Sequence, residues 1–365
     1  MSSSASSAVP PPRQSNFELL RIIAMFMILV VHADFWLLGL PTLAEFHAAP
    51  AGTWTRILIE SASIGCVNIF ILISGWFSIR VSVRGFCSFL FQCAFFLLGF
   101  YLLMIIAGQE QPGLRQLAPY LCFTKANWFI KAYIGLYILA PMLNLFAEKA
   151  TKRQLALTLL AFYSFQTLYG WTNSAVFVEQ GYSTFSFIGL YLLARYLKLH
   201  GNPLRGGEKW GSLNNSFFAV SRILYCLNKA VILNSALTVG LVCNNGERFV
   251  ALLYSYANPL VIVLSVMLIL KFAKLRIPYS PVINRIGKSS FAVFLFHANL
   301  TVFNFTFRKL IAGIYASYSG IACLFLIFCI LAALFFVAVL IDQFRIYCWN
   351  KLENSGCWRK LLPQS

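Results

Sequence analysis

The stretch FELLRIIAMFMILVVHADFWLL, residues 17–38, decides the fold class because it is long enough to cross a bilayer and yet contains ionisable side chains. Arg21 and His32 are eleven residues apart, which at about 100° per residue returns the helix to nearly the same face. Glu18 lies within about 60° of Arg21 on that face. Three ionisable groups on one stripe predict a buried polar site, because such groups are costly against lipid.

A simpler interpretation of this stripe stays open. In it Arg21 extends to the cytoplasmic headgroups and His32 lies at the opposite interface. The helical rise of about 1.5 Å per residue puts His32 roughly 16 Å deeper than Arg21, about half of a hydrocarbon core of ~30 Å. An imidazole at that depth needs polar partners, which favours a site in the bundle interior.

The composition places the whole chain among membrane proteins. Hydrophobic residues make up 59% of the chain and charged residues 11%, whereas soluble proteins average about 45–50% and 25%. The chain lacks the strand-like alternation of an outer-membrane barrel. We therefore predict an all-α fold, a polytopic transmembrane helix bundle of about ten spans. The predicted spans are residues 17–38, 57–79, 86–107, 128–147, 153–170, 183–199, 217–242, 249–273, 287–307 and 319–344.

The net charge of +18 is distributed as the orientation of a membrane protein requires. If the N-terminus is cytoplasmic, the even-numbered connections and the C-terminal tail hold most of the lysines and arginines. The positive-inside rule then predicts that both termini are cytoplasmic. The charge therefore indicates a multi-pass protein in contact with the lipid bilayer, and no nucleic-acid partner. We expect the cell inner (plasma) membrane as its location.

The sequence divides into three predicted regions. Residues 1–16 are rich in Ser, Ala and Pro, which is typical of a disordered tail, here a cytoplasmic one. Residues 17–345 form the transmembrane domain, and residues 346–365 form a second cytoplasmic tail. The ten cysteines lack the spacing of metal ligands, so we predict no metal site.

Further candidate residues lie beyond the first span. Arg80 and Arg84 are four apart and share one face of any continuing helix, where they would form a fork for phosphate. Ordinary positive-inside flanking explains the same pair. His297 lies in the ninth predicted span, and we expect it to face a cavity near His32, although a hydrogen-bonded packing role is the alternative. Asn258-Pro259 predicts a break in the eighth span.

Together these residues resemble the acyltransferase-3 superfamily of integral membrane O-acyltransferases, which includes enzymes that acetylate bacterial surface polysaccharides. The run SNFELLRIIA, residues 15–24, with His32 after it, is similar to the family's acidic-x-Leu-Arg opening and its histidine eleven residues after the arginine. The chain departs from the family in two places. Glu18 replaces the more frequent Asp, and three residues separate Arg80 from Arg84 where the family more commonly has two. Further similarities are Phe70 to Phe77 with its Ser-Gly-aromatic motif, Trp128-Phe129 with Tyr133, and Phe294 to His297.

The resemblance implies that residues 17–345 are a transmembrane acyltransferase domain, an O-acetyltransferase. It would transfer an acetyl or other short acyl group from acetyl-CoA to a hydroxyl of a surface polysaccharide or a lipid-linked sugar. Acyl-CoA is then a donor substrate, and no tightly bound cofactor is expected. The cytoplasmic donor and the sugar on the outer side of the bilayer agree with a polar stripe that runs between the two sides.

The implied roles follow from the matched positions. Arg80 and Arg84 would bind the donor, and Glu18 would pair with Arg21. His32 would act as general base on the acceptor hydroxyl or would accept the acyl group itself, because imidazole exchanges protons near neutral pH. His297 would orient the acceptor or relay its proton.

Two other classes of function stay open at this point. A polytopic transporter or polysaccharide flippase without transferase activity would also have many spans and a few buried charges. The absence of inverted halves with matched broken helices argues against it. A structural or sensor protein of the membrane would leave Arg21 and His32 without a role.

Overall fold

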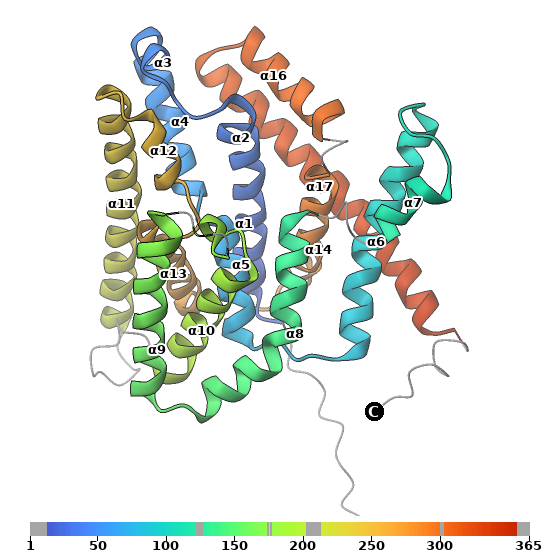
Figure 1. The fold of residues 1–365 in the computed structure, drawn as a ribbon, viewed down its shortest axis with the longest axis horizontal. Helices are drawn as coiled ribbons and strands as arrows, with labels where there is room; N and C mark the ends of the chain where they lie inside the picture. The colour runs from blue at the N-terminus through green and yellow to red at the C-terminus, as the bar shows by residue number, and fades with distance from the viewer. Residues whose placement is uncertain are drawn as a thin grey trace, which may run out of the picture.

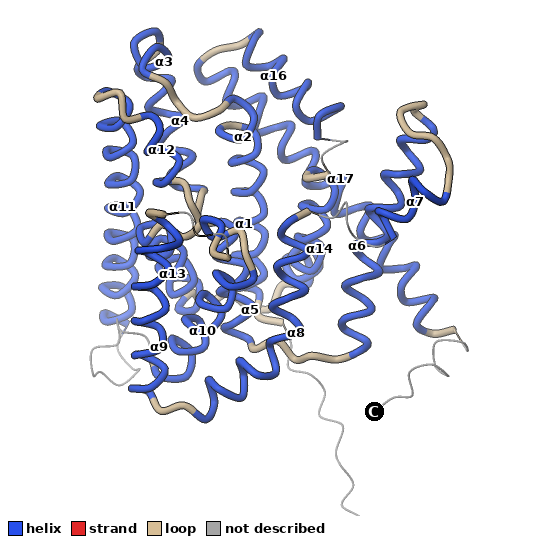
Figure 2. The backbone as a smooth tube through the Cα atoms, in the orientation of Figure 1, coloured by secondary structure: helices blue, strands red, loops and turns tan. Residues whose placement is uncertain are grey.

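We describe the protein from a computed structural model, which describes residues 13–121, 127–173, 175, 177–201, 213–299 and 303–355. Throughout this part of the chain the regular structure is helical and no strand occurs (Figures 1 and 2). The predicted all-α class is confirmed.

The helices form one bundle in which residues far apart in sequence lie side by side (Figure 1). In chain order they are α1 (Ser15–Ala33), α2 (Phe35–Leu38), α3 (Leu43–Ala48), α4 (Pro50–Ser63), α5 (Cys66–Phe77), α6 (Val83–Ile106), α7 (Leu114–Leu121), α8 (Trp128–Lys149), α9 (Lys152–Phe165), η1 (Gln166–Trp171), η2 (Glu179–Gly181), α10 (Thr184–His200), α11 (Leu213–Cys243), α12 (Glu247–Leu253), α13 (Pro259–Lys274), α14 (Pro281–His297), η3 (Phe303–Phe307), α16 (Arg308–Ser317) and α17 (Gly320–Glu353).

Six helical segments of the described chain are long and apolar enough to cross a membrane. The other predicted spans are also helical, but they are shorter or interrupted, as in α9 with η1 and α12 with α13. A membrane-spanning bundle is therefore supported, while the number of ten spans and the cytoplasmic placement of both termini stay predictions. The six segments are Ser15–Leu38, Pro50–Phe77, Val83–Ile106, Trp128–Lys149, Tyr225–Cys243 and Gly320–Glu353.

Helix α1 lies in the middle of the bundle (Figure 1) and packs against α4, α5, α13, α14 and α17. Apolar side chains such as Leu20, Ala24 and Leu29 are fully buried in these contacts. Because its neighbours fix the helix on several sides, the polar residues at its two ends keep a defined position relative to α5 and α14.

Two glycines allow neighbouring helices of the bundle to approach closely. A Cβ on Gly75 of α5 would lie 2.9 Å from the Cβ of Ala194 in α10, so only glycine fits there. Small residues such as Ser74 and Gly75 permit this close approach of two helices. A Cβ on Gly287 of α14 would lie 2.7 Å from the Cβ of Glu18, which brings α14 directly against the polar end of α1.

The break predicted at Asn258-Pro259 is confirmed. Helix α12 ends at Leu253, and α13 begins at Pro259 with Asn258 as its N-cap. The Asn258 Oδ1 atom accepts a hydrogen bond from the Leu260 backbone N–H at 2.9 Å. Its Nδ2 atom donates to the Leu253 carbonyl at 2.7 Å, so the polar groups that the break exposes are satisfied.

Three sequence predictions are corrected here. Arg80 and Arg84 do not share a helix face, because α5 ends at Phe77, Ser78 has a positive φ of 63°, and α6 begins only at Val83. The predicted N-terminal tail, residues 1–16, ends too late, because α1 begins at Ser15; residues 1–12 lie outside the described residues. The predicted boundary at residue 345 falls inside α17, which continues to Glu353.

Candidate active site

His32 and His297 are directly hydrogen-bonded to each other. His32 lies in the last turn of α1 and His297 is the last residue of α14. The His32 Nδ1 atom is 2.8 Å from His297 Nε2, and His297 Nδ1 is 2.6 Å from the carbonyl oxygen of Val293. The predicted proximity of the two histidines is therefore confirmed.

The Val293 carbonyl assigns the tautomers of both neutral rings. A carbonyl oxygen can only accept, so His297 Nδ1 must carry a proton and donate it to Val293. The Nε2 atom of the neutral His297 ring then has a free lone pair and accepts a hydrogen bond from His32 Nδ1–H. This leaves the Nε2 atom of His32 unprotonated, as a general base requires.

Aromatic rings surround the histidine pair. The centroids of His32 and Trp36 are 4.4 Å apart, and Phe303 lies 4.1 Å from Trp36. His297 is only 1% exposed and is also flanked by Phe307, with the ring centroids 5.9 Å apart. His32 is half-buried, so it is the member of the pair that faces open space.

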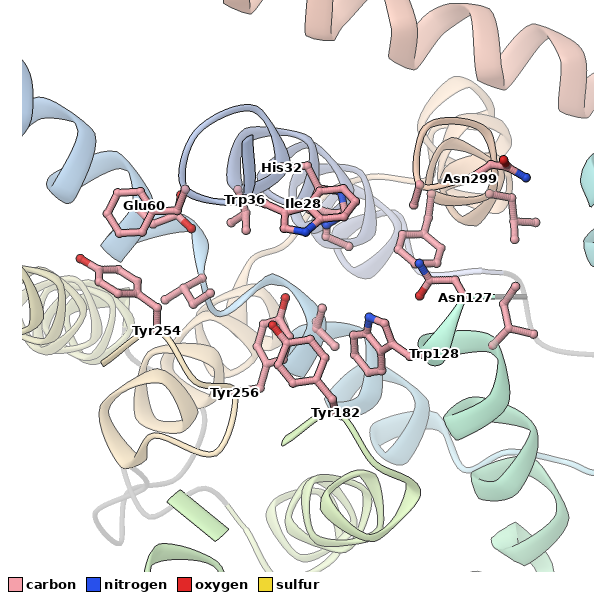
Figure 3. Close-up of a pocket in the computed structure, with 18 of the residues that line it drawn as sticks. Ile28, His32, Trp36, Glu60, Asn127, Trp128, Tyr182, Tyr254, Tyr256 and Asn299 are labelled. Carbon is pink, nitrogen blue, oxygen red and sulfur yellow. The ribbon is translucent and has the colours of Figure 1, made fainter. Parts of the chain in front are cut away.

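That space is a cavity of about 470 Å³, which we call the histidine cavity (Figure 3). His32 and Trp36 lie on one side of it, and Tyr182 and Tyr256 lie on the opposite side. Glu60 and Tyr254 lie together at one end, and Asn127 and Trp128 lie at the other (Figure 3). A lining of aliphatic and aromatic side chains with a few polar groups is typical of a binding site for a small organic molecule.

A second cavity, of about 250 Å³, lies at the other end of α1 and contains Arg21, so we call it the arginine cavity. Arg21 forms the predicted ion pair with Glu18, and Arg13 Nη1 lies 3.1 Å from the other carboxylate oxygen of Glu18. Lys288 of α14 also lines this cavity. The described residues that line this cavity include these three cations and no carboxylate, so the lining is positively charged, which favours an anionic ligand.

Three phenylalanines separate the two cavities, and we call them the aromatic partition. Phe129 and Phe291 line the arginine cavity, and Phe294 lines the histidine cavity. The centroid of the Phe129 ring is 5.9 Å from that of Phe291 and 5.5 Å from that of Phe294. Phe291 and Phe294 are 6.0 Å apart and stacked. The three rings therefore form a continuous aromatic contact from the lining of one cavity to the lining of the other.

Comparison with known proteins identifies the family to which this chain belongs. A family model described as an acyltransferase domain matches residues 14–342, which span the bundle from α1 into α17. The chain belongs to the acyltransferase-3 family. The comparisons with curated proteins and with solved structures returned no match. The protein is thus a membrane acyltransferase, and both histidines lie within the matched region.

The acyltransferase does not use Arg80 and Arg84 as a fork at either cavity. Arg80 is exposed, and Arg84 is ion-paired with Glu353 of α17. Neither residue lines the histidine cavity or the arginine cavity. Their predicted role in donor binding stays a prediction without support from the geometry.

The other predicted motif residues divide between the two cavities of the acyltransferase. Trp128 lines the histidine cavity, whereas Tyr133, one turn further along α8, lines the arginine cavity. The Tyr133 hydroxyl is 3.3 Å from Ser74 Oγ, which places the Ser-Gly motif at the same cavity. The first two turns of α8 therefore contribute to both sides of the aromatic partition.

Sequence analysis missed Glu60, Arg13 and Lys288. Glu60 is the one acidic residue in the predicted span 57–79, and a carboxyl inside an apolar run is the same signal that singled out Arg21. Lys288 lies at the very start of the predicted span 287–307, where a flanking charge is ordinary, and Arg13 lies in the stretch predicted to be disordered. Only the fold brings Arg13 and Lys288 to one cavity.

Proposed function

We propose that this acyltransferase transfers an acetyl or other short acyl group from acetyl-CoA on the cytoplasmic side of the inner (plasma) membrane. The acceptor is a hydroxyl of a surface polysaccharide or lipid-linked sugar on the opposite side. The observation that carries the proposal is the arrangement along α1, where a cation-rich cavity and an imidazole base occupy opposite ends of one buried helix. Transfer of an acyl group to a hydroxyl requires a base at the acceptor, and the imidazole of His32 can provide one.

The donor binds at the arginine cavity. CoA carries several phosphates, and Arg13, Arg21 and Lys288 supply the positive charge that phosphates need. The cavity is smaller than the whole CoA molecule, so the nucleotide stays at its mouth and the long pantetheine arm enters. The thioester then reaches the aromatic partition, beyond which His32 lies.

The acceptor hydroxyl binds in the histidine cavity beside His32 Nε2. This nitrogen removes the hydroxyl proton while the oxygen attacks the thioester carbonyl. A bond between the sugar oxygen and the acyl carbon forms, the bond between that carbon and sulfur breaks, and the CoA thiolate takes the proton from the imidazolium. His297 Nε2 accepts the Nδ1–H hydrogen bond of His32 and so stabilises the imidazolium until its proton passes to the thiolate.

The same nitrogen serves the covalent alternative. In that sequence His32 Nε2 attacks the thioester carbonyl first, the bond between the acyl carbon and sulfur breaks, and CoA leaves as the thiolate from a cationic acylimidazole. The sugar oxygen then takes the acyl group, which restores neutral His32, and the hydroxyl proton converts the released thiolate to the thiol. Either order requires the unprotonated Nε2 that the hydrogen bonds to His297 and Val293 leave facing the cavity.

Transfer of radiolabel tests the proposed reaction. Purified protein is incubated with [¹⁴C]acetyl-CoA and a membrane-glycan extract, and the label in the glycan is measured after mild alkali, which releases O-acetyl groups. We expect alkali-labile label that depends on the protein. Movement of glycan across the bilayer without any incorporated label would instead indicate a flippase.

Replacing both Arg13 and Lys288 by glutamine should weaken donor binding more than the chemical step. Loss of two phosphate contacts at an accessible cavity mouth acts mainly on ground-state affinity, so we expect KM for acetyl-CoA to rise about tenfold with kcat largely retained. The matched double variant Arg80→Gln with Arg84→Gln should change KM by less than about twofold. The reverse order of effects, measured by initial rates over a range of acetyl-CoA concentrations, would assign donor binding to Arg80 and Arg84.

His297→Gln should keep partial activity where His32→Gln keeps none. The glutamine Oε1 atom can accept the His32 Nδ1–H bond that His297 Nε2 accepts now, although it has more rotational freedom. We expect a decrease of about 10- to 100-fold in kcat for His297→Gln, within the ordinary range for a partner that orients a base. Equal losses in the two variants, measured side by side on purified protein, would show that His297 contributes more than orientation.

A further inference from the structure

Glu60 is a buried carboxyl whose hydrogen bonds the protein does not complete. It lies in the last turn of α4, is 1% exposed, and lines the histidine cavity beside Tyr254 (Figure 3). Its Oε2 atom has no hydrogen-bond partner among the described residues. A buried carboxyl oxygen without a donor is costly, so this position is built for a group that comes from outside the chain.

The nearest cation is already engaged elsewhere. Arg56, one turn before Glu60 on α4, donates from Nε to Asp34 Oδ1 at 2.6 Å and from Nη1 to Glu45 Oε2 at 3.2 Å. A third donor, Nη2, bonds the Gly39 carbonyl at 3.0 Å. Arg56 therefore ties α3 and the end of α1 to α4, and its donors are used in doing so.

The polar neighbours of Glu60 satisfy one another. The Tyr254 hydroxyl lies 3.0 Å from both Ser61 Oγ and Thr238 Oγ1. Asn234 Nδ2 donates to Ser61 Oγ at 3.2 Å. This network fixes the wall of the cavity behind Glu60, and Glu60 lines the cavity with its Oε2 atom unpartnered.

The rest of the cavity suits the apolar faces of a sugar ring. Trp128 lies 4.5 Å from Tyr182 and 6.1 Å from Tyr256 between ring centroids, and Tyr182 lies 4.8 Å from Tyr256. The described residues that line this cavity include no lysine and no arginine. An anionic group of a ligand would be desolvated there without a compensating cation, close to a carboxyl.

We propose that Glu60 is the acceptor-positioning residue of this enzyme and that the histidine cavity takes an uncharged sugar in preference to an anionic one. The proposal rests on the function proposed above. One or two hydroxyls of the sugar donate hydrogen bonds to Glu60, the ring stacks on the aromatic wall, and a further hydroxyl reaches His32 Nε2. Glu60 touches the acceptor but takes no part in the proton transfer.

The test compares a neutral glycoside with its uronate counterpart, which differs by a carboxylate at C6. Initial rates of acetyl transfer are measured for the wild type, for Glu60→Gln and for the matched control Glu45→Gln. Glu45 carries a carboxyl in the helix cap of α3, where glutamine preserves the capping box. Acetyl-CoA hydrolysis without acceptor is measured in parallel as a check that each variant is folded and binds donor.

We expect the wild type to prefer the neutral glycoside by at least about tenfold in kcat/KM, the scale of one mismatched polar interaction. Glu60→Gln should raise KM for the neutral glycoside about tenfold, so that the ratio of kcat/KM between the neutral glycoside and the uronate becomes smaller. KM for acetyl-CoA and the rate of acceptor-independent hydrolysis should not change. Glu45→Gln should behave as wild type. In addition, the neutral glycoside should raise the Tm of the wild-type protein at concentrations where the uronate does not.

Several results would overturn the proposal. A wild type that transfers acetyl but prefers the uronate contradicts the neutral-sugar specificity. If Glu60→Gln leaves both KM for the neutral glycoside and the preference over the uronate unchanged, Glu60 does not position the acceptor. If that variant fails to fold, the Tm of the wild type decides, because an equal rise in Tm with both glycosides refutes the specificity. Thioester cleavage without transfer to any glycan would overturn the proposed function itself, and the role of Glu60 with it.

Discussion

Replacing His32 by alanine is expected to abolish acyl transfer while membrane insertion and expression stay unchanged. His32 lines the histidine cavity, and its Nε2 atom is the nitrogen that the hydrogen bonds to His297 and Val293 leave unprotonated. Removal of a general base costs about 10²- to 10⁴-fold in rate, and removal of an acyl carrier costs at least as much. Purified variant and wild type are compared by acetyl transfer at saturating acetyl-CoA.

His47→Ala is the matched control for this variant. His47 is exposed in the last turn of α3 and lines neither cavity, so its removal tests the general effect of losing an imidazole. We expect the control to retain wild-type activity. Residual activity of His32→Ala within a few-fold of the wild type would remove His32 from the mechanism and return it to the simpler interpretation of an interfacial side chain.

Arg21→Lys is expected to be severely defective although the charge is conserved. The guanidinium of Arg21 pairs with the buried Glu18, while Arg13 holds the second carboxylate oxygen. A lysine ammonium is a point charge and does not reproduce the planar fork that serves Glu18 and a donor phosphate or carbonyl at once. Leaving a buried carboxylate partly unpaired costs about 1–3 kcal/mol, so we expect kcat/KM for acetyl-CoA to fall about 10- to 100-fold.

Arg308→Lys provides the control for Arg21→Lys. Arg308 is exposed at the start of α16 and lines neither cavity, so its replacement by lysine makes the same chemical change outside the site. The control should keep wild-type kinetics. Near-normal turnover of Arg21→Lys would mean that Arg21 acts only as a charge that orients the first span.

The first predicted span already contained three of the polar residues of the site, Glu18, Arg21 and His32. Its spacing placed Glu18 and Arg21 on one helix face, and the ion pair between them follows directly from a separation of three residues on a helix. The contact between His32 and His297 was predicted from a different argument, that an imidazole in an apolar span needs a polar partner. Both arguments need only local geometry and the cost of burial.

The residues that sequence reasoning placed wrongly depend on chain reversals that carry no local signal. Arg80 and Arg84 fit a helical spacing, but the chain leaves the helix at Ser78 with a positive φ, although neither glycine nor proline marks that position. Arg13 and Lys288 lie far apart in sequence and meet only because α14 packs against α1 at Gly287. Periodicity within one segment does not predict such a contact.

The measurement that tests the central claim most directly is sided acetyl transfer in sealed proteoliposomes. Protein of known orientation is reconstituted, [¹⁴C]acetyl-CoA is supplied only at the face that carries Arg13 and Lys288, and the glycan acceptor is supplied only at the other face. The account predicts alkali-labile label in the glycan across the membrane, absent in His32→Ala. Label that appears only when donor and acceptor share one face, or that persists in His32→Ala, would contradict it.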